Sequence, residues 1–302
     1  MRIYTTYFFL IFFVFFKLSC AKSDNTSSNP TAKSDNTSSN PTASSSIKFL
    51  AVGSSGTILT SSDGISWTSR TSGTSNDLWG VTYANSNFVT DGSSFSSGVT
   101  VETSFSSGTI LTSSDGISWT SRSSGILNNL WGVTYANSTF VAVGNSGTIL
   151  TSSDGINWIG RTSNTTRTLN SVVFAKNTFL VVGYSGTILT SSDGISWTSR
   201  TSGTSCDLGE VCTSRHFVAV TNSNSTFVAV GLGGTVSTSS DGISWTSRTS
   251  GTSNSLYGVI HSNSNFMAVG RSGTILTSSD GTSWTSRTSG TSNNLWVVNS
   301  IE

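Results

Sequence analysis

Short apolar runs recur along residues 47–298, separated by clusters of Ser, Thr, Asn and Gly. In the best-preserved copy they occupy residues 130–135, 140–143, 148–151 and 158–161. Their β-branched and aromatic residues predict strands, and no window has a sustained helical period. The second and third runs are apolar at consecutive positions, so both faces should be covered, whereas the fourth is polar after its Trp, as is typical of a protected edge. We therefore expect a repeating unit of four antiparallel strands.

One string, Ser-Ser-Asp-Gly-Ile-Ser-Trp with small variations, marks every unit. Successive copies are 39 residues apart, except where one interval is 52 and another is 48 residues long. Periods of this length are typical of propellers and solenoids, in which one unit cannot bury its own apolar faces. Four strands with a polar outermost strand favour a propeller blade, and a β-solenoid is the alternative. The Asp residues of the string are Asp63, Asp115, Asp154, Asp193, Asp241 and Asp280.

The repeats begin and end in the middle of a unit. Residues 49–52 correspond to a second strand, and residues 295–298 correspond to a first strand. The C-terminal strand is therefore expected to join the N-terminal blade and close the ring by hydrogen bonds. The predicted fold class is all-β, a six-bladed β-propeller of four-stranded antiparallel blades.

The repeated string resembles the Asp-box of the BNR-repeat propellers, which include sialidase-like and photosystem II stability and assembly factor-like proteins. The family pattern is Ser-x-Asp-x-Gly-x-x-Trp; here Gly follows Asp directly, which points toward the non-enzymatic or uncharacterised branches of the family. The resemblance implies that the box is the turn between the third and fourth strands. The six Asp residues are interpreted as structural, because Asp and Ser side chains hold tight turns and six separate blades cannot bring them to one site. The repeated Arg residues of the fourth strands are interpreted as scaffold too.

The first 46 residues predict where the protein is located. Arg2 precedes a ten-residue apolar run at 7–16, which is too short for a bilayer and suits a signal peptide over residues 1–20. Its end, Leu18-Ser19-Cys20, resembles a bacterial lipobox and implies a lipidated Cys20, although Lys17 departs from that motif. Ordinary secretion and an uncleaved anchor are the alternatives. Residues 21–46, a Ser/Thr/Asn linker, lack the hydrophobes needed for order, and the propeller is assigned to residues 47–302. We expect an exported lipoprotein anchored in a membrane, either at the outer membrane and cell surface or in the periplasm.

The net charge and the lack of catalytic motifs limit the functions that the sequence supports. A net charge of +1 without a basic run argues against nucleic-acid binding. No carboxylate pair stands out as a general acid and base, and no phosphate loop appears. We predict no enzymatic activity, cofactor or metal. The alternative enzyme is a degenerate sialidase-like glycan hydrolase that uses Glu102 or Glu210.

Two cysteines of the body lie close together in the sequence. Cys206 and Cys212 would form a disulfide only if their segment loops out, because a regular strand separates their Cα atoms by about 20 Å against a limit of about 7 Å. A metal site that adds His216 has no recognised spacing.

A binding face is predicted where the repeats disagree. The turn between the second and third strands differs at Ser54, Asn145, Tyr184, Leu232 and Arg271. The first strands bring aromatic residues toward the same face near the channel: Trp79, Trp131, Tyr257 and Trp296. Aromatic rings beside polar residues suit a protein or glycan partner. The predicted function is a non-catalytic binding or assembly platform. The alternatives are the hydrolase and a purely structural repeat protein, in which these rings only pack blades.

Overall fold

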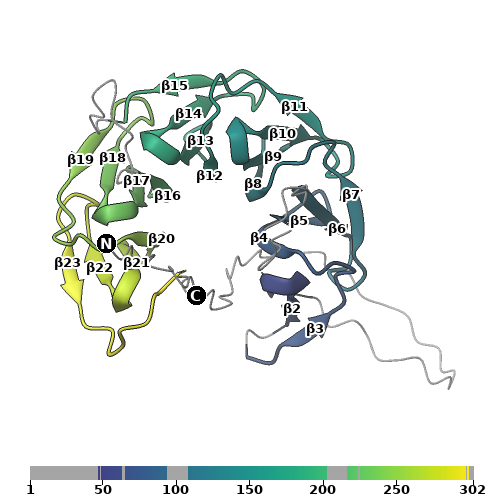
Figure 1. Cartoon of the computed structure of the whole chain (residues 1–302), viewed down its shortest axis with the longest axis horizontal. Coiled ribbons are helices and arrows are strands. Elements are labelled where there is room, and N and C mark those ends of the chain that lie inside the picture. Colours follow the sequence, from purple (N-terminus) through teal and green to yellow (C-terminus); the bar gives the residue numbers. More distant parts are fainter. Residues whose placement is uncertain are drawn as a thin grey trace, which may run out of the picture.

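A computed structural model describes residue 47, residues 49–62, 65–93, 108–202, 216–223 and 225–296, and residue 298. The signal peptide, Cys20 and the linker predicted before residue 47 lie outside these residues, as do Asp63, Glu102, Cys206, Glu210 and Cys212. Six antiparallel sheets succeed one another around a central axis (Figure 1). Each sheet is a blade, and the strands of each blade follow the order of the sequence. The all-β propeller predicted from the repeats is confirmed.

The strand bounds follow the predicted runs to within one or two residues. The first blade holds β1 (Phe49–Val52), β2 (Ile58–Ser61) and β3 (Thr68–Arg70). The second holds β4 (Asp77–Ala84), β5 (Asn87–Ser93), β6 (Gly108–Ser113) and β7 (Thr120–Ser123). The third holds β8 (Leu130–Ala136), β9 (Thr139–Gly144), β10 (Ile149–Ser152) and β11 (Ile159–Arg161). The fourth holds β12 (Leu169–Ala175), β13 (Thr178–Gly183), β14 (Ile188–Ser191) and β15 (Thr198–Arg200). The fifth holds β16 (Phe217–Asn222), β17 (Phe227–Gly231), β18 (Val236–Ser239) and β19 (Thr246–Arg248). The sixth holds β20 (Leu256–Ser262), β21 (Asn265–Gly270), β22 (Ile275–Ser278) and β23 (Thr285–Arg287).

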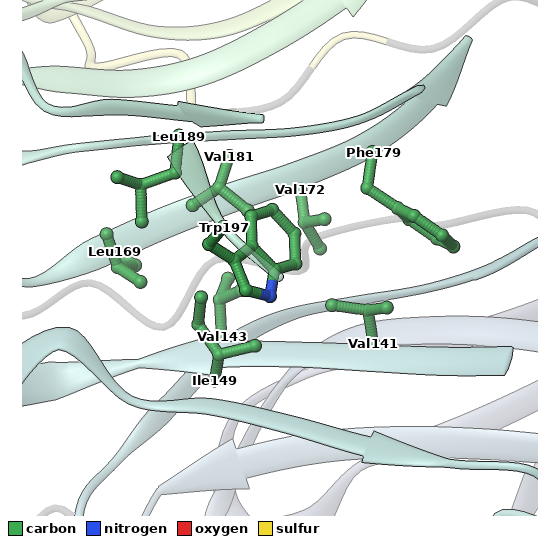
Figure 2. Close-up of a cluster of buried hydrophobic side chains, with 9 residues drawn as sticks. All are labelled: Val141, Val143, Ile149, Leu169, Val172, Phe179, Val181, Leu189 and Trp197. Carbon is green, nitrogen blue, oxygen red and sulfur yellow. The ribbon is translucent and has the colours of Figure 1, made fainter. Parts of the chain in front are cut away.

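The core lies between blades. Five apolar clusters of buried residues each join two consecutive blades, from the first and second to the fifth and sixth. In Figure 2, Val141 and Val143 of β9 meet Val181 of β13 and Trp197, which precedes β15. Burying apolar area of this kind is the main stabilising term in folding. The consecutive apolar positions of the second and third strands therefore have the two covered faces that they require.

The Asp-boxes fold as the turns between third and fourth strands. In the fourth blade, Asp193 Oδ1 accepts hydrogen bonds from the backbone N–H groups of Ile195 and Ser196, both at 2.8 Å. Ser191 Oγ donates to the same oxygen at 2.8 Å, and Trp197 Nε1 donates to the carbonyl of Gly194 at 3.0 Å. This network recurs around Asp115, Asp154, Asp241 and Asp280. The carboxylates thus hold local turns on separate blades.

The repeated Arg residues contact the third strand of their own blade. In every blade the Arg Nε donates to the Oγ1 of a Thr ten residues earlier, at 2.7–2.8 Å. This bond fixes the short outer strand against its neighbour. The guanidinium therefore has a structural partner on the adjacent strand.

The expected closing strand differs in the structure. The N-terminal sheet contains three strands, in the order β1-β2-β3, and the described residues at 295, 296 and 298 are not strand. The first and last blades stand on either side of an interval in the ring (Figure 1). Leu295 is nevertheless held by the sixth blade, because its N–H donates to the Gly270 carbonyl at 2.9 Å, as Leu78 donates to Gly53 at 3.0 Å. Leu295 thus contacts the sixth blade in the way that the first strand of a following blade would. The hydrogen-bonded pairing with β1 that the sequence predicts is not formed by the described residues.

Candidate binding face around the central channel

The first strand of each complete blade carries a β-bulge near its start. The register shifts immediately after a buried Leu or Phe in all five of these strands. A bulge adds one residue and changes the direction of its side chain. The bulged residue is therefore only partly buried, although the residue before it is in the core. The five bulged residues are Trp79, Trp131, Asn170, Val218 and Tyr257.

The bulged tryptophans donate hydrogen bonds to the end of the second strand or to the turn that follows it. Trp131 Nε1 donates to Asn145 Oδ1 at 2.6 Å, and Trp79 Nε1 donates to Ser93 Oγ at 2.8 Å. The two indole rings lie 5.3 Å apart between centroids. The structure therefore brings together three of the predicted site residues, Trp79, Trp131 and Asn145, at one end of the second and third blades.

These turns are short 3-10 segments that the next blade holds in place. They are η1 (Ser54–Gly56), η2 (Asn145–Gly147), η3 (Tyr184–Gly186), η4 (Leu232–Gly234) and η5 (Arg271–Gly273). The middle residue of each is left-handed, for example Ser55 with φ 53° and Ser185 with φ 54°. Four of these residues donate their backbone N–H to a side chain that directly precedes the Leu or Phe of the next unit: Asp77 at 2.8 Å, His216 at 3.0 Å, Ser255 at 3.3 Å and Asn294 at 3.0 Å. The variable first residue of each turn, from Ser54 to Arg271, is thus presented at the same end of its blade.

His216 and Tyr184 form a contact that the sequence did not predict. Their rings lie 4.4 Å apart, and the Ser185 N–H donates to His216 Nδ1, which places the proton of the neutral imidazole on Nε2. Burial and then the positive charge of Arg167 lower the pKa of His216, which favours the neutral ring. The sequence held a signal for this contact, because His216 directly precedes Phe217 just as Asp77 directly precedes Leu78 in the second blade. It had been considered only as a metal ligand.

The remaining predicted residues fall into two groups. Tyr257 stacks on Trp296 at 4.2 Å with an interplanar angle of 16°, which places an aromatic pair beside the sixth blade. Tyr184 is 43% exposed, Arg271 is exposed and Leu232 is half-buried, each at the start of its own turn. The predicted aromatic residues of the first strands therefore form two pairs, whereas Tyr184, Leu232 and Arg271 lie on three separate blades.

In the part of the chain that the structure describes, no group of three or more His, Cys, Asp or Glu residues is placed to hold a metal ion, and none of the helices has the length and hydrophobicity needed to span a bilayer. The two carboxylates weighed for hydrolysis, Glu102 and Glu210, and both cysteines of the predicted disulfide are outside the described residues.

Solved structures with the same architecture match the chain. YCF48 from Cyanidioschyzon merolae is 18% identical, with a TM-score of 0.60 over 82% of this chain and 83% of that one. YCF48 bound to D1 peptide is 17% identical, with a TM-score of 0.58 over 78% of this chain and 76% of that one. These matches show that the fold of this chain is a β-propeller. The GH74 enzyme of Niastella koreensis also matches this propeller, at 19% identity and a TM-score of 0.52 over 78% of this chain and 35% of the enzyme.

These likenesses concern the fold of the propeller. At identities below 20%, architecture is shared while the functional site has to be argued from its own residues. No protein-family model matches the sequence, and no curated protein matches it.

Proposed function

We propose that this propeller is a non-catalytic binding platform for a protein partner, whose segment docks on the face formed by Trp79, Trp131 and the turn residues. The observation that carries the proposal is the paired, partly exposed indoles, which the β-bulges aim out of the core and which Asn145 and Ser93 hold in place. Rigid aromatic anchors with a satisfied polar end are the side chains that most often dominate protein interfaces. The D1 peptide bound to a YCF48 of similar fold supports a protein ligand for this architecture.

The aromatic pairs around the channel suit an extended segment better than a small substrate. Trp79 and Trp131 belong to neighbouring blades, and Tyr257 and Trp296 form a second pair at the sixth blade. A segment that crosses the channel can contact both pairs, with Tyr184 and Arg271 at the rim as polar and charged contacts. A glycan partner is the other outcome of the test below.

The proposed location of the protein is a membrane surface. It rests on the sequence of residues 1–46, in which an apolar run ends at Leu18-Ser19-Cys20 and a polar linker follows. The lipid on Cys20 would tether the propeller, and the linker would hold the binding face away from the bilayer. Labelling with a fatty-acid analogue in a bacterial host tests this: incorporation should occur in the full chain and be lost in Cys20→Ser. Labelling that persists in that variant would reject the anchor.

The binding proposal is tested with the full chain on a peptide array and a glycan array. We expect retained ligands to be peptides and their signal to fall at least about tenfold in W79A/W131A, as for loss of aromatic hot spots. The matched control is I156A/I195A, which removes exposed apolar groups from Asp-box turns at the other end of the blades. Equal losses in both double variants, or ligands found only among glycans, would reject a protein-binding channel face.

A further inference from the structure

Three grooves on the outer rim of the disc are copies of one another. They lie in the second, third and sixth blades and enclose about 600, 770 and 470 Å³. Each is bounded by the start of the third strand, by the end of the fourth strand and by the linker that leaves the blade. We call them the rim grooves and identify them by their Arg residues: Arg122, Arg161 and Arg287. None of the aromatic residues of the channel face lines them, although the grooves of the third and sixth blades include the last two residues of η2 and of η5.

The walls of the rim grooves are held in place by hydroxyl and amide groups. Thr109, Thr148 and Thr274 line them at the third strand, and each Oγ1 accepts a hydrogen bond from an Asn side chain of the incoming linker, at 2.7, 2.9 and 2.9 Å. The outgoing linker folds back through a Ser whose Oγ donates to the carbonyl two residues later, at 3.0–3.2 Å. The wall is thus a set of fixed polar groups.

One cation lines each groove. The Nε of Arg122, Arg161 and Arg287 donates to a Thr of the third strand at 2.8 Å, which fixes the plane of the guanidinium. Within the described residues this is the hydrogen bond that each guanidinium makes, so its terminal N–H groups are available to a ligand. No carboxylate is among the residues that line the three grooves. A planar guanidinium held in this way suits bidentate binding of a carboxylate or sulfate group.

The lining chemistry distinguishes between classes of partner. No aromatic residue lines the rim grooves, so they lack the anchors that usually dominate protein interfaces. The same absence of aromatic rings leaves no platform on which nucleic-acid bases could stack, whereas the hydroxyl and amide groups of the walls suit the hydroxyls of sugars. We propose that the rim grooves bind successive units of an acidic polysaccharide, whose hydroxyls meet the Ser, Thr and Asn walls and whose anionic groups meet the Arg residues.

The repetition of the grooves fits a polymer. A polymer that occupies the groove of the second blade is held near the groove of the neighbouring third blade, so its affinity exceeds that of a single sugar unit through effective concentration. Short fragments should therefore bind weakly even when every contact within one groove is made.

The test measures binding of the full chain to immobilised polygalacturonate and to dextran sulfate, with uncharged dextran alongside. The variant S123E/T162E/T288E places a carboxylate in each rim groove at an exposed position. We expect binding to fall at least about tenfold through like-charge repulsion, and trigalacturonate to compete at least about thirtyfold less well than the polymer. The carboxylate and sulfate polymers show which anionic group is preferred.

The control variant is T120E/I159E/T285E, which adds the same three charges to exposed positions at the start of the fourth strands of the same three blades, outside the residues that line the grooves. It should retain binding to within about twofold, as expected for surface substitutions away from the site. Failure of the wild-type chain to bind either acidic polymer would overturn the proposal. Equal losses in both triple variants, equal binding to dextran, or equally tight binding of single-stranded DNA would overturn it too. W79A/W131A should leave this binding unchanged, which separates it from the channel face.

Discussion

Trp131 and Asn145 are joined by a hydrogen bond of 2.6 Å between the indole Nε1 and the amide oxygen, across the hairpin of β8 and β9. The bond exists because a β-bulge turns the indole out of the core and toward the turn. Thr168 Oγ1 of the next blade reaches the same oxygen at 3.4 Å. Asn145 Oδ1 therefore links the indole of Trp131, the turn η2 and the neighbouring fourth blade.

Removing the indole N–H should weaken this junction. In W131F the Asn145 oxygen loses its shortest hydrogen bond while the aromatic contact is largely kept. We expect the free energy of unfolding to fall by about 1 kcal/mol, the usual net value of one hydrogen bond. Urea denaturation followed by far-UV circular dichroism measures it. An unchanged midpoint would mean that the bond has no net value at this half-exposed site.

The Asp-box carboxylates should matter for stability in every blade. Asp193 Oδ1 accepts two backbone N–H groups and the Ser191 hydroxyl, so D193A leaves three donors without their acceptor. We expect a loss of about 1–3 kcal/mol, and a smaller loss in D193N, which keeps an oxygen at the same place. Thermal denaturation of both variants tests this. Equal effects of the two substitutions would assign the stability to the charge alone.

Stability should fall in acid because of the same turns. The N–H groups of Ser196 and then of Ile195 lower the pKa of Asp193 to about 2, and the pKa values of Asp154 and Asp280 are also lowered. A carboxyl whose pKa is lower in the folded chain contributes stability above the unfolded value, about 3.9, and loses it as the pH falls through the folded value. We therefore expect melting temperatures to drop between about pH 4 and pH 2. The drop should be smaller in D193N, and a drop of the same size in that variant would contradict the assignment.

The chain end should stabilise the first blade. Asn294 and Leu295 bond to η5 and Gly270 as Asp77 and Leu78 bond to η1 and Gly53. Pairing of the following residues with β1 would supply the fourth strand that the first blade lacks. Hydrogen exchange should therefore show protected amides in Phe49–Val52 in the full chain and faster exchange after deletion of residues 295–302. Equal exchange in both chains would mean that the ring stays open in solution.

The local elements of this protein follow from its sequence. Asp, Gly and Trp in a fixed order dictate each box, because a carboxylate that accepts neighbouring N–H groups makes the turn without help from elsewhere. The consecutive apolar residues of β9 and β10 require two covered faces, which a stack of blades provides. The repeat therefore determined the strands, their order and the propeller.

The tertiary structure alone decided the features that carry the site. The bulges at Trp79 and Trp131 depend on how each first strand packs on the next blade, and the sequence of a single strand does not encode this register. The contact of Tyr184 with His216 is likewise formed between segments of neighbouring units. The Asp-box turns depend on hydrogen bonds within a few residues of the chain. The bulges and the contacts between units form only after the blades have packed, because the groups that make them are distant in the chain.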